Sequence, residues 1–535
     1  MANSQPKPYT RPPRFKIDIP GDDTFRTSIL SKIAKVRDYL RMKLGSCVTN
    51  ATVMENILDF WDKNHQVESG TDEYWAGMNM YMATPIENTD QRNFVVSDFS
   101  FDKMIQVAEQ HGRHCTSDLS VINTIYRGHC VIKKLRCKRH KARHNYSWAS
   151  SPYLPNGEFL CNTRIGHGYF ASGILPVQYR RFTEAAGIGT ISKQKQKALF
   201  EDYKPCVKEE YKASTLKALN EEKQRYPEGE GIEIETDARH GWRKNAKDSS
   251  IACLGDKTHK VLSCQNISKE DDKVAQRHEK IGTVRLYEYF DSTGTKIKIH
   301  SHDRNLSINK YLRVHQKDTK NQNDVWHGVK GASKAVLEVG QGAKKRQGAT
   351  WHEQLHDKAQ PVATHIHWAV QNCEGNPDYI RNSLDNVVKH YSNDHRKCAK
   401  ISRCKKDRKY KPSRVVITNK KAKDLLQTAI ENNVIYKHPE DYVLGRTTYH
   451  TESFNNVFNI FTDKRISMGS DNYQMRANLA VVHWNENVDR DVTSVWTSEA
   501  TGSSQRQRTK KNRKANTYVY RNNIWQRLMA NLYHQ

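Results

Sequence analysis

The spacing of apolar residues divides the chain into regions of helical and strand-like character. Near the N-terminus, residues 24–44 and 52–64 repeat apolar side chains at three- and four-residue steps, which is typical of amphipathic helices. They predict a helical module over residues 23–110, used for DNA binding or dimerisation, although packing alone would give the same pattern. Residues 161–230 are polar and helical in pattern, and predict a helical connector.

From residue 231 the pattern changes to short alternating runs bounded by turns, which is typical of strands. Four strands are expected over residues 232–236, 250–254, 261–267 and 296–300, with a helix over residues 272–290 before the fourth strand. A fifth strand is expected to begin at Asp324-Val-Trp-His327. Three strands, a helix and a fourth strand form the front half of a ribonuclease H-like fold. We therefore expect an α/β protein with the first part of this core over residues 231–330.

The remaining chain predicts an insertion into this core and two basic ends. Residues 331–436 are helical in pattern and rich in His, Trp and Lys, which predicts a helical insertion. Residues 437–500 contain a further helical segment near Glu452 and are expected to complete the core. Residues 1–22 are expected to be a disordered basic arm. Residues 501–535 are expected to be a basic C-terminal tail, suited to nuclear localisation or phosphate binding or acting only as a solubilising tail.

The charge of the chain indicates the class of its partner. Lys and Arg number 87 against 59 Asp and Glu, which gives a formal net charge of +28. Such an excess favours a polyanionic partner. No apolar run approaches the roughly 18 to 20 residues of a membrane-spanning helix, so nucleic acid is expected rather than a membrane. The Pro- and Lys-rich N-terminus does not resemble a secretory signal. A basic structural protein with a solvated surface is the alternative.

Cysteine and histidine gather in two basic regions, which favours zinc over disulfides in an intracellular protein. In residues 111–160, expected to be a zinc-binding basic module, Cys137 and His140 have the two-residue gap of a zinc knuckle. Cys115, with His111 or His114, could form a first knuckle of irregular spacing. The alternative is surface histidines and a buried cysteine. The helical insertion holds a second candidate set, in which the alternative is that the histidines only decorate a helix. Its members could meet on one structural, tetrahedral zinc ion: His390, His395, Cys398 and Cys404.

Two aspartates stand where a metal-dependent phosphodiester site would need them. Asp237 ends the first expected strand and Asp303 follows the fourth. Two divalent ions held by carboxylates can activate an oxygen nucleophile and stabilise the leaving oxygen, and Mg²⁺ needs only a few such ligands. An Asp after a strand is more often a turn former or a helix cap, so it is the joint placement that carries weight. A third carboxylate is expected on a later helix.

Around these residues the sequence resembles eukaryotic cut-and-paste DDE transposases of the Kolobok and Mutator-like group. The resemblance covers roughly residues 110 to 490 and rests on the order of four motifs: Glu-Thr-Asp237-Ala-Arg-His, His-Asp303-Arg-Asn, Asp324-Val-Trp-His327 and Tyr449-His-Thr-Glu452-Ser-Phe. It implies that Asp237, Asp303 and Glu452 bind Mg²⁺ or Mn²⁺. It also implies that Asp324 and His327 lie beside them, shaping the site or binding the DNA backbone. Glu440 and Asp441 compete with Glu452 for the third position.

The resemblance implies a DNA transposase that cleaves transposon ends and joins their 3′-ends to target DNA. Its partners would be double-stranded DNA, at the terminal inverted repeats and the target, and a second copy of the chain in a homodimer or higher oligomer. Its cofactors would be Mg²⁺ (or Mn²⁺) and Zn²⁺, and its location the nucleus. Two alternatives stay open: a domesticated zinc-containing DNA-binding protein without cleavage activity, and a zinc-containing nuclease without strand transfer.

Overall fold

The computed structural model describes residues 92–534 apart from 142, 243–244, 408, 465 and 499–507. The expected basic arm and the two helical stretches near the N-terminus lie outside these residues. The described part is a mixed α/β structure. It contains no helix that is long and apolar enough to cross a membrane.

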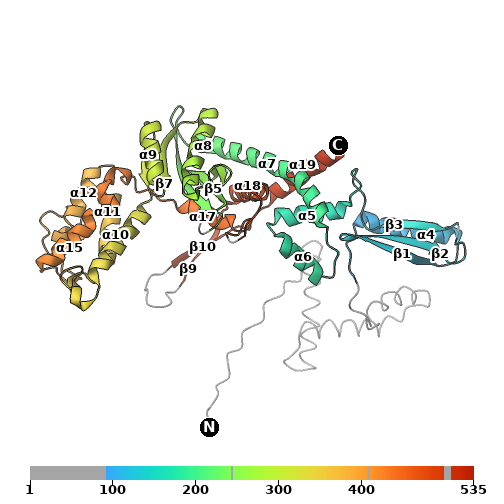
Figure 1. Cartoon of the computed structure of the whole chain (residues 1–535), viewed down its shortest axis with the longest axis horizontal. Helices are drawn as coiled ribbons and strands as arrows, with labels where there is room; N and C mark the ends of the chain where they lie inside the picture. The colour runs from blue at the N-terminus through green and yellow to red at the C-terminus, as the bar shows by residue number, and fades with distance from the viewer. Residues whose placement is uncertain are drawn as a thin grey trace, which may run out of the picture. The chain divides into compact units, whose positions relative to one another are not determined.

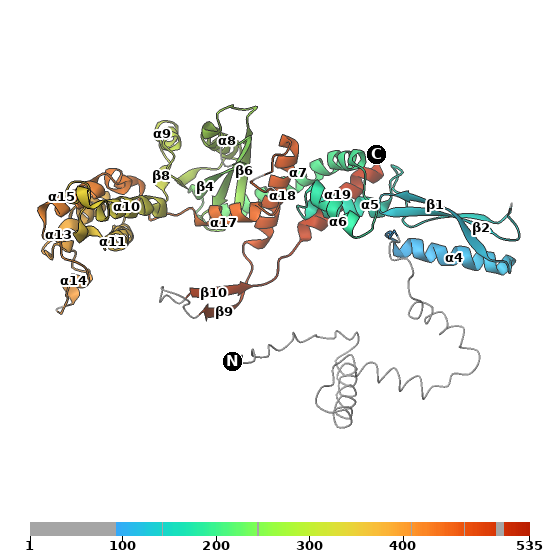
Figure 2. The ribbon, with the colours of Figure 1, turned by 60° about the horizontal axis from the view of Figure 1, so that its bottom comes forward.

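The first described elements form a small antiparallel sheet backed by a helix (Figure 2). They are α4 (Asp98–His114), β1 (Leu119–Arg127), β2 (Cys130–Cys137) and β3 (Asn145–Ala149), with the strands in the order β1-β2-β3. The indole of Trp148 on β3 donates to the carbonyl of Ser100 on α4. These strands were not predicted, because Lys and Arg are interspersed among their apolar residues and only the cysteines and histidines stood out.

Three helices follow, as the polar helical pattern of residues 161–230 predicts. They are α5 (Leu160–Ala171), α6 (Pro176–Ala185) and the long α7 (Lys193–Lys223). Their apolar side chains, among them Phe170, Tyr203 and Val207, belong to a core that also receives residues from the C-terminal helices.

A five-stranded mixed sheet lies at the centre of the described part (Figure 1). Its elements in chain order are β4 (Ile232–His240), β5 (Asp248–Gly255), β6 (Val261–Ser268), α8 (His278–Ser292), β7 (Ile297–His302), α9 (Leu306–His315) and β8 (Lys320–Asn323). The strand order is β6-β5-β4-β7-β8. Neighbours among β4, β5 and β6 run antiparallel, whereas β7 and β8 continue parallel to β4. Helices α8 and α9 provide the crossovers that parallel strands need.

The expected strands of this region lie close to their predicted positions, but the fifth does not. The prediction of a strand beginning at Asp324 is wrong, because β8 ends at Asn323 and Asp324 is the N-cap of the next helix, α10 (Val325–Gly340). Its side chain accepts a hydrogen bond from the backbone N–H of His327 at 3.0 Å. An N-cap aspartate satisfies backbone donors that the first turn leaves free, which explains why the helix begins directly after Asp324.

Successive residues of β4 point to opposite faces of the sheet, as in any strand. Ile232 and Ile234 pack with Leu286 and Phe290 of α8. The opposite face is covered by α17 (Tyr449–Phe458) and α18 (Ser470–Asn487), and Figure 2 shows α8 and α17 on either side of the sheet. The odd-numbered positions of β4 from Glu233 to Arg239 are polar, so this second face of the strand carries its acidic side chains.

Between β8 and α17 the chain forms the helical region that was expected as an insertion. After α10 it contains α11 (Ala359–Gln371), α12 (Pro377–Asp385), α13 (Val387–Tyr391), α14 (Arg403–Lys406), α15 (Lys420–Glu431) and α16 (Val434–Lys437). Three short 3₁₀ helices accompany these α-helices: η2 (Lys344–Arg346) and η3 (Glu353–Leu355) between α10 and α11, and η4 (Pro439–Asp441) after α16. A further 3₁₀ helix, η1 (Ala275–Arg277), precedes α8. These helices share a hydrophobic core of their own, to which Val336, Ile366 and Leu426 belong.

The prediction of a basic tail over residues 501–535 is wrong for the described part of that range. β10 (Arg508–Arg513) pairs with β9 (Val492–Ser498), and α19 (Val519–His534) follows. Four side chains of α19 are at most 2% exposed and belong to the core shared with α7 and α18: Tyr520, Ile524, Leu528 and Leu532. These apolar residues recur every fourth position, which is a helical pattern. The prediction of a tail rested on the basic residues that precede them.

Candidate functional site

Three aspartates occupy neighbouring positions across the parallel half of the sheet. Thr236 of β4 pairs with His302 of β7, and His302 pairs with Asn323 of β8. The residues that come next on the three strands are Asp237, Asp303 and Asp324. The structure therefore brings together, at one sheet edge, aspartates separated by 66 and 21 positions (303 minus 237, and 324 minus 303).

Asp303, Asp324 and His327 form a group that could hold a metal ion. One ligand atom from each of the three lies within 4.8 Å of the others. His327 Nδ1 is 3.2 Å from an oxygen of Asp303 and 3.7 Å from one of Asp324. His327 and Asp303 are partly exposed, whereas Asp324 is buried.

The buried carboxylate of Asp324 has a full set of hydrogen bonds. One oxygen accepts from the backbone N–H of His327, and the other accepts from the N–H and the hydroxyl of Thr448 at 2.8 and 2.9 Å. Thr448 is the N-cap residue of α17, and its hydroxyl is also 3.1 Å from Asp303. Asp324 thus joins the starts of α10 and α17, and its main contribution is to hold α17 against the strand ends.

Asp237 lies within β4 rather than at its end, since the strand continues to His240. Burial, followed by the nearby charge of Asp303, raises the pKa of Asp237 to about 7. Burial also raises the pKa of Glu279, a carboxylate on α8 close enough to Asp303 for its charge to contribute. Glu279 accepts a hydrogen bond from Asn305 at 2.8 Å and was not singled out from the sequence, where it is one glutamate in an ordinary helical pattern. A divalent cation would neutralise the negative charge of carboxylates that lie this close together.

Glu452 lies in the first turn of α17, on the side that faces the aspartates. Thr448, four residues earlier, contacts Asp303 and Asp324, and the amide of Asn455, three residues later, donates to Asp237 at 2.6 Å. Residues three and four apart share one face of a helix, so Glu452 is between these two contacts. Its side chain is exposed, and the metal-capable groups among the described residues do not include it.

The two carboxylates that compete with Glu452 have other surroundings. Asp441 is buried, pairs with Arg313 at 2.7 Å and accepts from the amide of Asn321 at 3.0 Å. Glu440 is 3.6 Å from His438 in the short helix η4. Neither residue lies on α17, so the geometry favours Glu452 for the third position.

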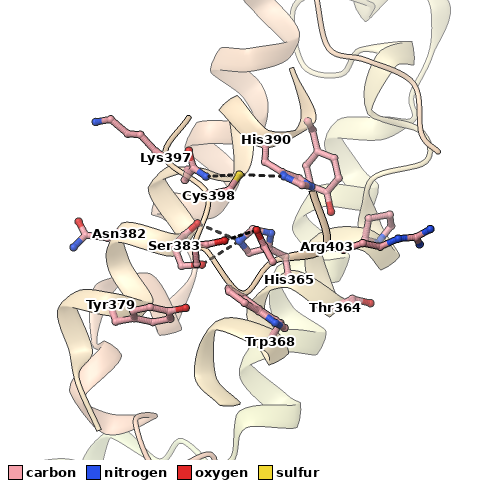
Figure 3. Close-up of a pocket in the computed structure, with 15 residues that line it drawn as sticks. Thr364, His365, Trp368, Tyr379, Asn382, Ser383, His390, Lys397, Cys398 and Arg403 are labelled. Carbon is pink, nitrogen blue, oxygen red and sulfur yellow. Dashed lines mark hydrogen bonds between the residues drawn. The ribbon is translucent and has the colours of Figure 1, made fainter. Parts of the chain in front are cut away.

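The four His and Cys residues proposed in the helical region come together. One ligand atom from each of His390, His395, Cys398 and Cys404 lies within 4.8 Å of the others, so they form a group that could hold a metal ion. His390 Nδ1 and His395 Nδ1 are 3.2 Å apart, and Cys398 Sγ is 3.5 and 3.7 Å from these two atoms. Figure 3 shows His390 and Cys398 pointing toward one another.

A cavity of about 460 Å³ opens beside this group (Figure 3). Trp368 and Tyr379 provide aromatic walls, and Lys397 and Arg403 bring positive charge to its lining. His365, within the cavity, makes hydrogen bonds to Ser383, and burial lowers its pKa to about 4. The cavity combines aromatic surface with basic groups at the edge of the His/Cys group.

The N-terminal His/Cys group has a different composition from the predicted one. The group that could hold a metal ion contains His111, Cys115, Cys137 and His144. The prediction that His140 is a ligand is not supported by this geometry, since His140 lies in the turn after β2 and its backbone N–H donates to Cys137 Sγ. The regular gap of two residues pointed to His140, whereas the group receives His111, one of the two histidines considered with Cys115, from the end of α4, and His144 from the residue before β3.

The thiols of this group are close together without forming a disulfide. Cys115 Sγ and Cys137 Sγ are 3.7 Å apart. Burial opposes ionisation of Cys137, but hydrogen bonds, led by the backbone N–H of His140 and followed by His111, lower its pKa to about 5. All ten cysteines among residues 92–534 that the structure describes are free. A thiolate of this kind is suited to metal binding.

The comparisons with known proteins return no match: no protein-family model and no curated protein matches the sequence.

Proposed function

We propose that the protein is a DNA transposase that cleaves the ends of its element and joins their 3′-ends to target DNA. The observation that carries the proposal is the row formed by Asp237, within β4, and by Asp303 and Asp324, directly after β7 and β8, with Glu452 on a helix held over it. Carboxylates gathered at a sheet edge are suited to bind the divalent ions that phosphodiester chemistry needs. The net charge of +28 supports a nucleic-acid substrate.

We also propose that the five-stranded sheet is a ribonuclease H-like core. Its support is the strand order β6-β5-β4-β7-β8, three antiparallel strands followed by two parallel ones, with the aspartates on the first and fourth strands in the sequence order of the core. The helical region between β8 and α17 would then be an insertion before the helix that carries the last catalytic carboxylate. This arrangement explains why 149 positions separate Asp303 from Glu452 (452 minus 303).

In the proposed mechanism Asp237, Asp303 and Glu452 hold Mg²⁺ or Mn²⁺. These ions would supply an activated water or 3′-hydroxyl nucleophile and stabilise the leaving oxygen. Asp237 binds from within β4, where Asn455 orients one of its oxygens. Asp324 acts through Thr448 by fixing α17, and His327 orients Asp303 from the other side. Since His327 is partly exposed, it is also placed to contact the DNA backbone.

The two His/Cys groups are proposed to be structural zinc sites. Tetrahedral zinc with Zn–S bonds of about 2.3 Å and Zn–N bonds of about 2.0–2.1 Å holds two sulfurs about 3.8 Å apart and a nitrogen and a sulfur about 3.6 Å apart. Cys115 and Cys137 are 3.7 Å apart, and Cys398 is 3.5 and 3.7 Å from the His390 and His395 nitrogens. The distances therefore suit zinc. With four ligands each, neither group leaves a position open for substrate.

Several basic surfaces are candidates for contacting DNA in a nuclear protein. The hairpin of β9 and β10 exposes Lys510, Lys511 and Trp496, and Lys510 lies 4.9 Å from the centre of the Trp496 ring. Lys397 and Arg403 beside the insertion's cavity form a second surface. Such residues bind phosphates without reading sequence. Holding two element ends at once would require at least a dimer.

The test is an excision assay in cells with a reporter flanked by the element's own ends. Wild type is compared with Asp237→Ala, Asp303→Ala and Glu452→Gln. Asp318→Ala, an exposed aspartate in the turn before β8, and Glu338→Gln, an exposed glutamate on α10, are matched controls. The proposal expects excision by wild type and both controls, and a loss of excision in the three site variants although they still fold and bind DNA.

Two outcomes would overturn parts of this proposal. Excision that persists in Asp237→Ala or Asp303→Ala would show that these carboxylates are not the catalytic metal ligands. A wild-type chain that binds verified ends but never excises them would instead favour a transposase-derived DNA-binding protein. Cleavage without joining of a 3′-end to target DNA would favour a nuclease.

A further inference from the structure

A fourth set of side chains that could hold a metal ion lies on the same sheet face as Asp237 and was not anticipated from the sequence. It consists of Glu235 on β4, His259 in the connection between β5 and β6, and His450 in the first turn of α17. One ligand atom of each lies within 4.8 Å of the others. His450 Nδ1 is 3.6 Å from Glu235 Oε1, and the rings of His259 and His450 are nearly parallel, with centres 3.5 Å apart.

Glu235 is a buried carboxylate with an unused oxygen. Its residue is 5% exposed, and Oε1 has no hydrogen-bond partner. The neighbouring carboxylates Glu233 and Asp256 are both paired with the guanidinium of Arg446, whereas Glu235 has only His450 as a described ion-pair partner. A buried carboxylate oxygen that lacks a hydrogen-bond partner is free to coordinate a cation, and Oε1 of Glu235 faces His450.

His259 also presents an unused polar atom to this group. Its Nδ1 is buried and makes no hydrogen bond. The backbone of His259 has a φ of 55°, in the left-handed region that few residues other than Gly adopt. Two hydrogen bonds keep it there: its N–H donates to Gly255 at 2.9 Å, and its carbonyl accepts from the indole of Trp484 at 2.8 Å. The fold therefore holds this imidazole in place against His450.

We propose that Glu235, His259 and His450 form a further metal site, which takes a zinc-class divalent ion. Two imidazoles and one carboxylate suit Zn²⁺ and related transition metals, whereas Mg²⁺ prefers oxygen ligands throughout. A tetrahedral ion would hold its ligand atoms about 3.4 Å apart, close to the 3.6 Å between Glu235 and His450. Three protein ligands leave a fourth position for water.

The proposed ion would tie three separate segments to one another. It would connect β4, the β5–β6 connection and α17, with His450 two residues before Glu452. Glu235 is two residues before Asp237 on the same strand face, about 7 Å away. The site is therefore distinct from the carboxylate row and from both His/Cys groups, and its existence does not depend on the proposed transposase activity.

The test counts bound zinc in the full chain. The protein is stripped with a chelator, dialysed against Zn²⁺ in an excess of Mg²⁺, and its zinc content is measured by mass spectrometry of the elements. Glu235→Gln and the double variant His259→Gln, His450→Gln should each bind one zinc fewer per chain than wild type. His315→Gln, an exposed histidine of α9, should bind the wild-type number. An equal number in wild type and both site variants would overturn the proposal.

A second measurement uses only the wild-type chain, so that it does not depend on how the variants fold. Histidines are modified with diethyl pyrocarbonate with and without Zn²⁺, and the peptides are mapped. Zinc should slow modification of His259 and His450 several-fold and leave His315 unaffected. Unchanged modification of both residues, with protection of His390 as the positive control, would overturn the proposal. DNA cleavage does not enter either readout, so a failed transposase assignment would leave this result intact.

Discussion

The side-chain amide of Asn455 donates a hydrogen bond to Asp237 at 2.6 Å across 218 positions of sequence. The contact joins α17 to β4 three residues after Glu452. It shows how a helix distant in sequence is aligned with the strand that carries the first aspartate.

Replacing Asn455 with Ala removes this contact. At pH 8, where most of Asp237 is ionised, we expect the free energy of unfolding to fall by about 1.5–3 kcal/mol, the usual contribution of a hydrogen bond to a charged group. Urea denaturation measures the change. Asn456→Ala, at the exposed neighbouring position, should be close to neutral. Equal effects of the two substitutions would mean that the contact does not hold α17 in place.

The raised pKa values of Asp237 and Glu235 predict a pH-dependent response to divalent metal. Burial is the first cause of each shift, and the values are about 7 and about 8. Both exceed the ordinary carboxyl values of about 4, so the folded chain keeps protons that the unfolded chain has released. The contribution of these two carboxyl groups to metal-free stability should therefore fall as pH rises from about 4 to 8.

A bound divalent ion takes the place of these protons. Mg²⁺ should therefore raise the melting temperature of the chain more at pH 8 than at pH 5, which a thermal-shift titration can measure. Asp237→Asn should reduce the difference between the two pH values. A Mg²⁺ effect of equal size at pH 5 and pH 8 would contradict this assignment.

Asp324 is expected to matter for stability as well as for activity. Asp324→Ala would leave the backbone N–H groups of His327 and Thr448 and the Thr448 hydroxyl without their acceptor. Losing an N-cap and burying unsatisfied donors should together cost about 2–4 kcal/mol. Equilibrium unfolding measures this, and Asp318→Ala, in an exposed turn, is the matched control. A cost below that of the control would show that Asp324 does not anchor α17.

If the His/Cys group of the helical region binds zinc, the local stability of that region should depend on the metal. Cys398→Ser or Cys404→Ser should each release one zinc per chain and make residues 386–410 more sensitive to limited proteolysis, since a structural zinc ion supplies folding free energy. Cys161→Ser, a half-buried cysteine outside the four metal-capable groups of the described residues, should retain the zinc content. Unchanged zinc content in both site variants would exclude zinc from this group.

The last helix should be essential for the core of the described part. Leu528 is fully buried among residues of α7 and α18, so Leu528→Ala should cost about 2–5 kcal/mol through lost burial and a cavity. Gln526→Ala, on the exposed side of α19, should change the unfolding free energy by less than about 0.5 kcal/mol. Similar stabilities of the two variants would mean that α19 does not pack into this core.

Local patterns predicted much of the fold and part of the site. The alternating runs over residues 232–236, 261–267 and 296–300 became β4, β6 and β7 because period-2 apolar spacing suits strands with a buried face. Asp303 directly follows β7, as its position after an alternating run indicated. His390, His395, Cys398 and Cys404 lie within 15 consecutive residues, so a short chain can bring them together and their spacing alone was informative.

The tertiary structure decided what spacing cannot encode. Asp237, Asp303 and Asp324 lie in one row because of the register of the parallel strands. Asp324 is buried and hydrogen-bonded because α17 packs beside it. His111 replaces His140 because α4 packs along the small sheet, and Glu235, His259 and His450 meet only where three distant segments pack. The sequence determined the local elements and their charges, since these follow from neighbouring residues. Which side chains share a site was decided by long-range packing, because strand register and helix placement depend on contacts hundreds of residues apart.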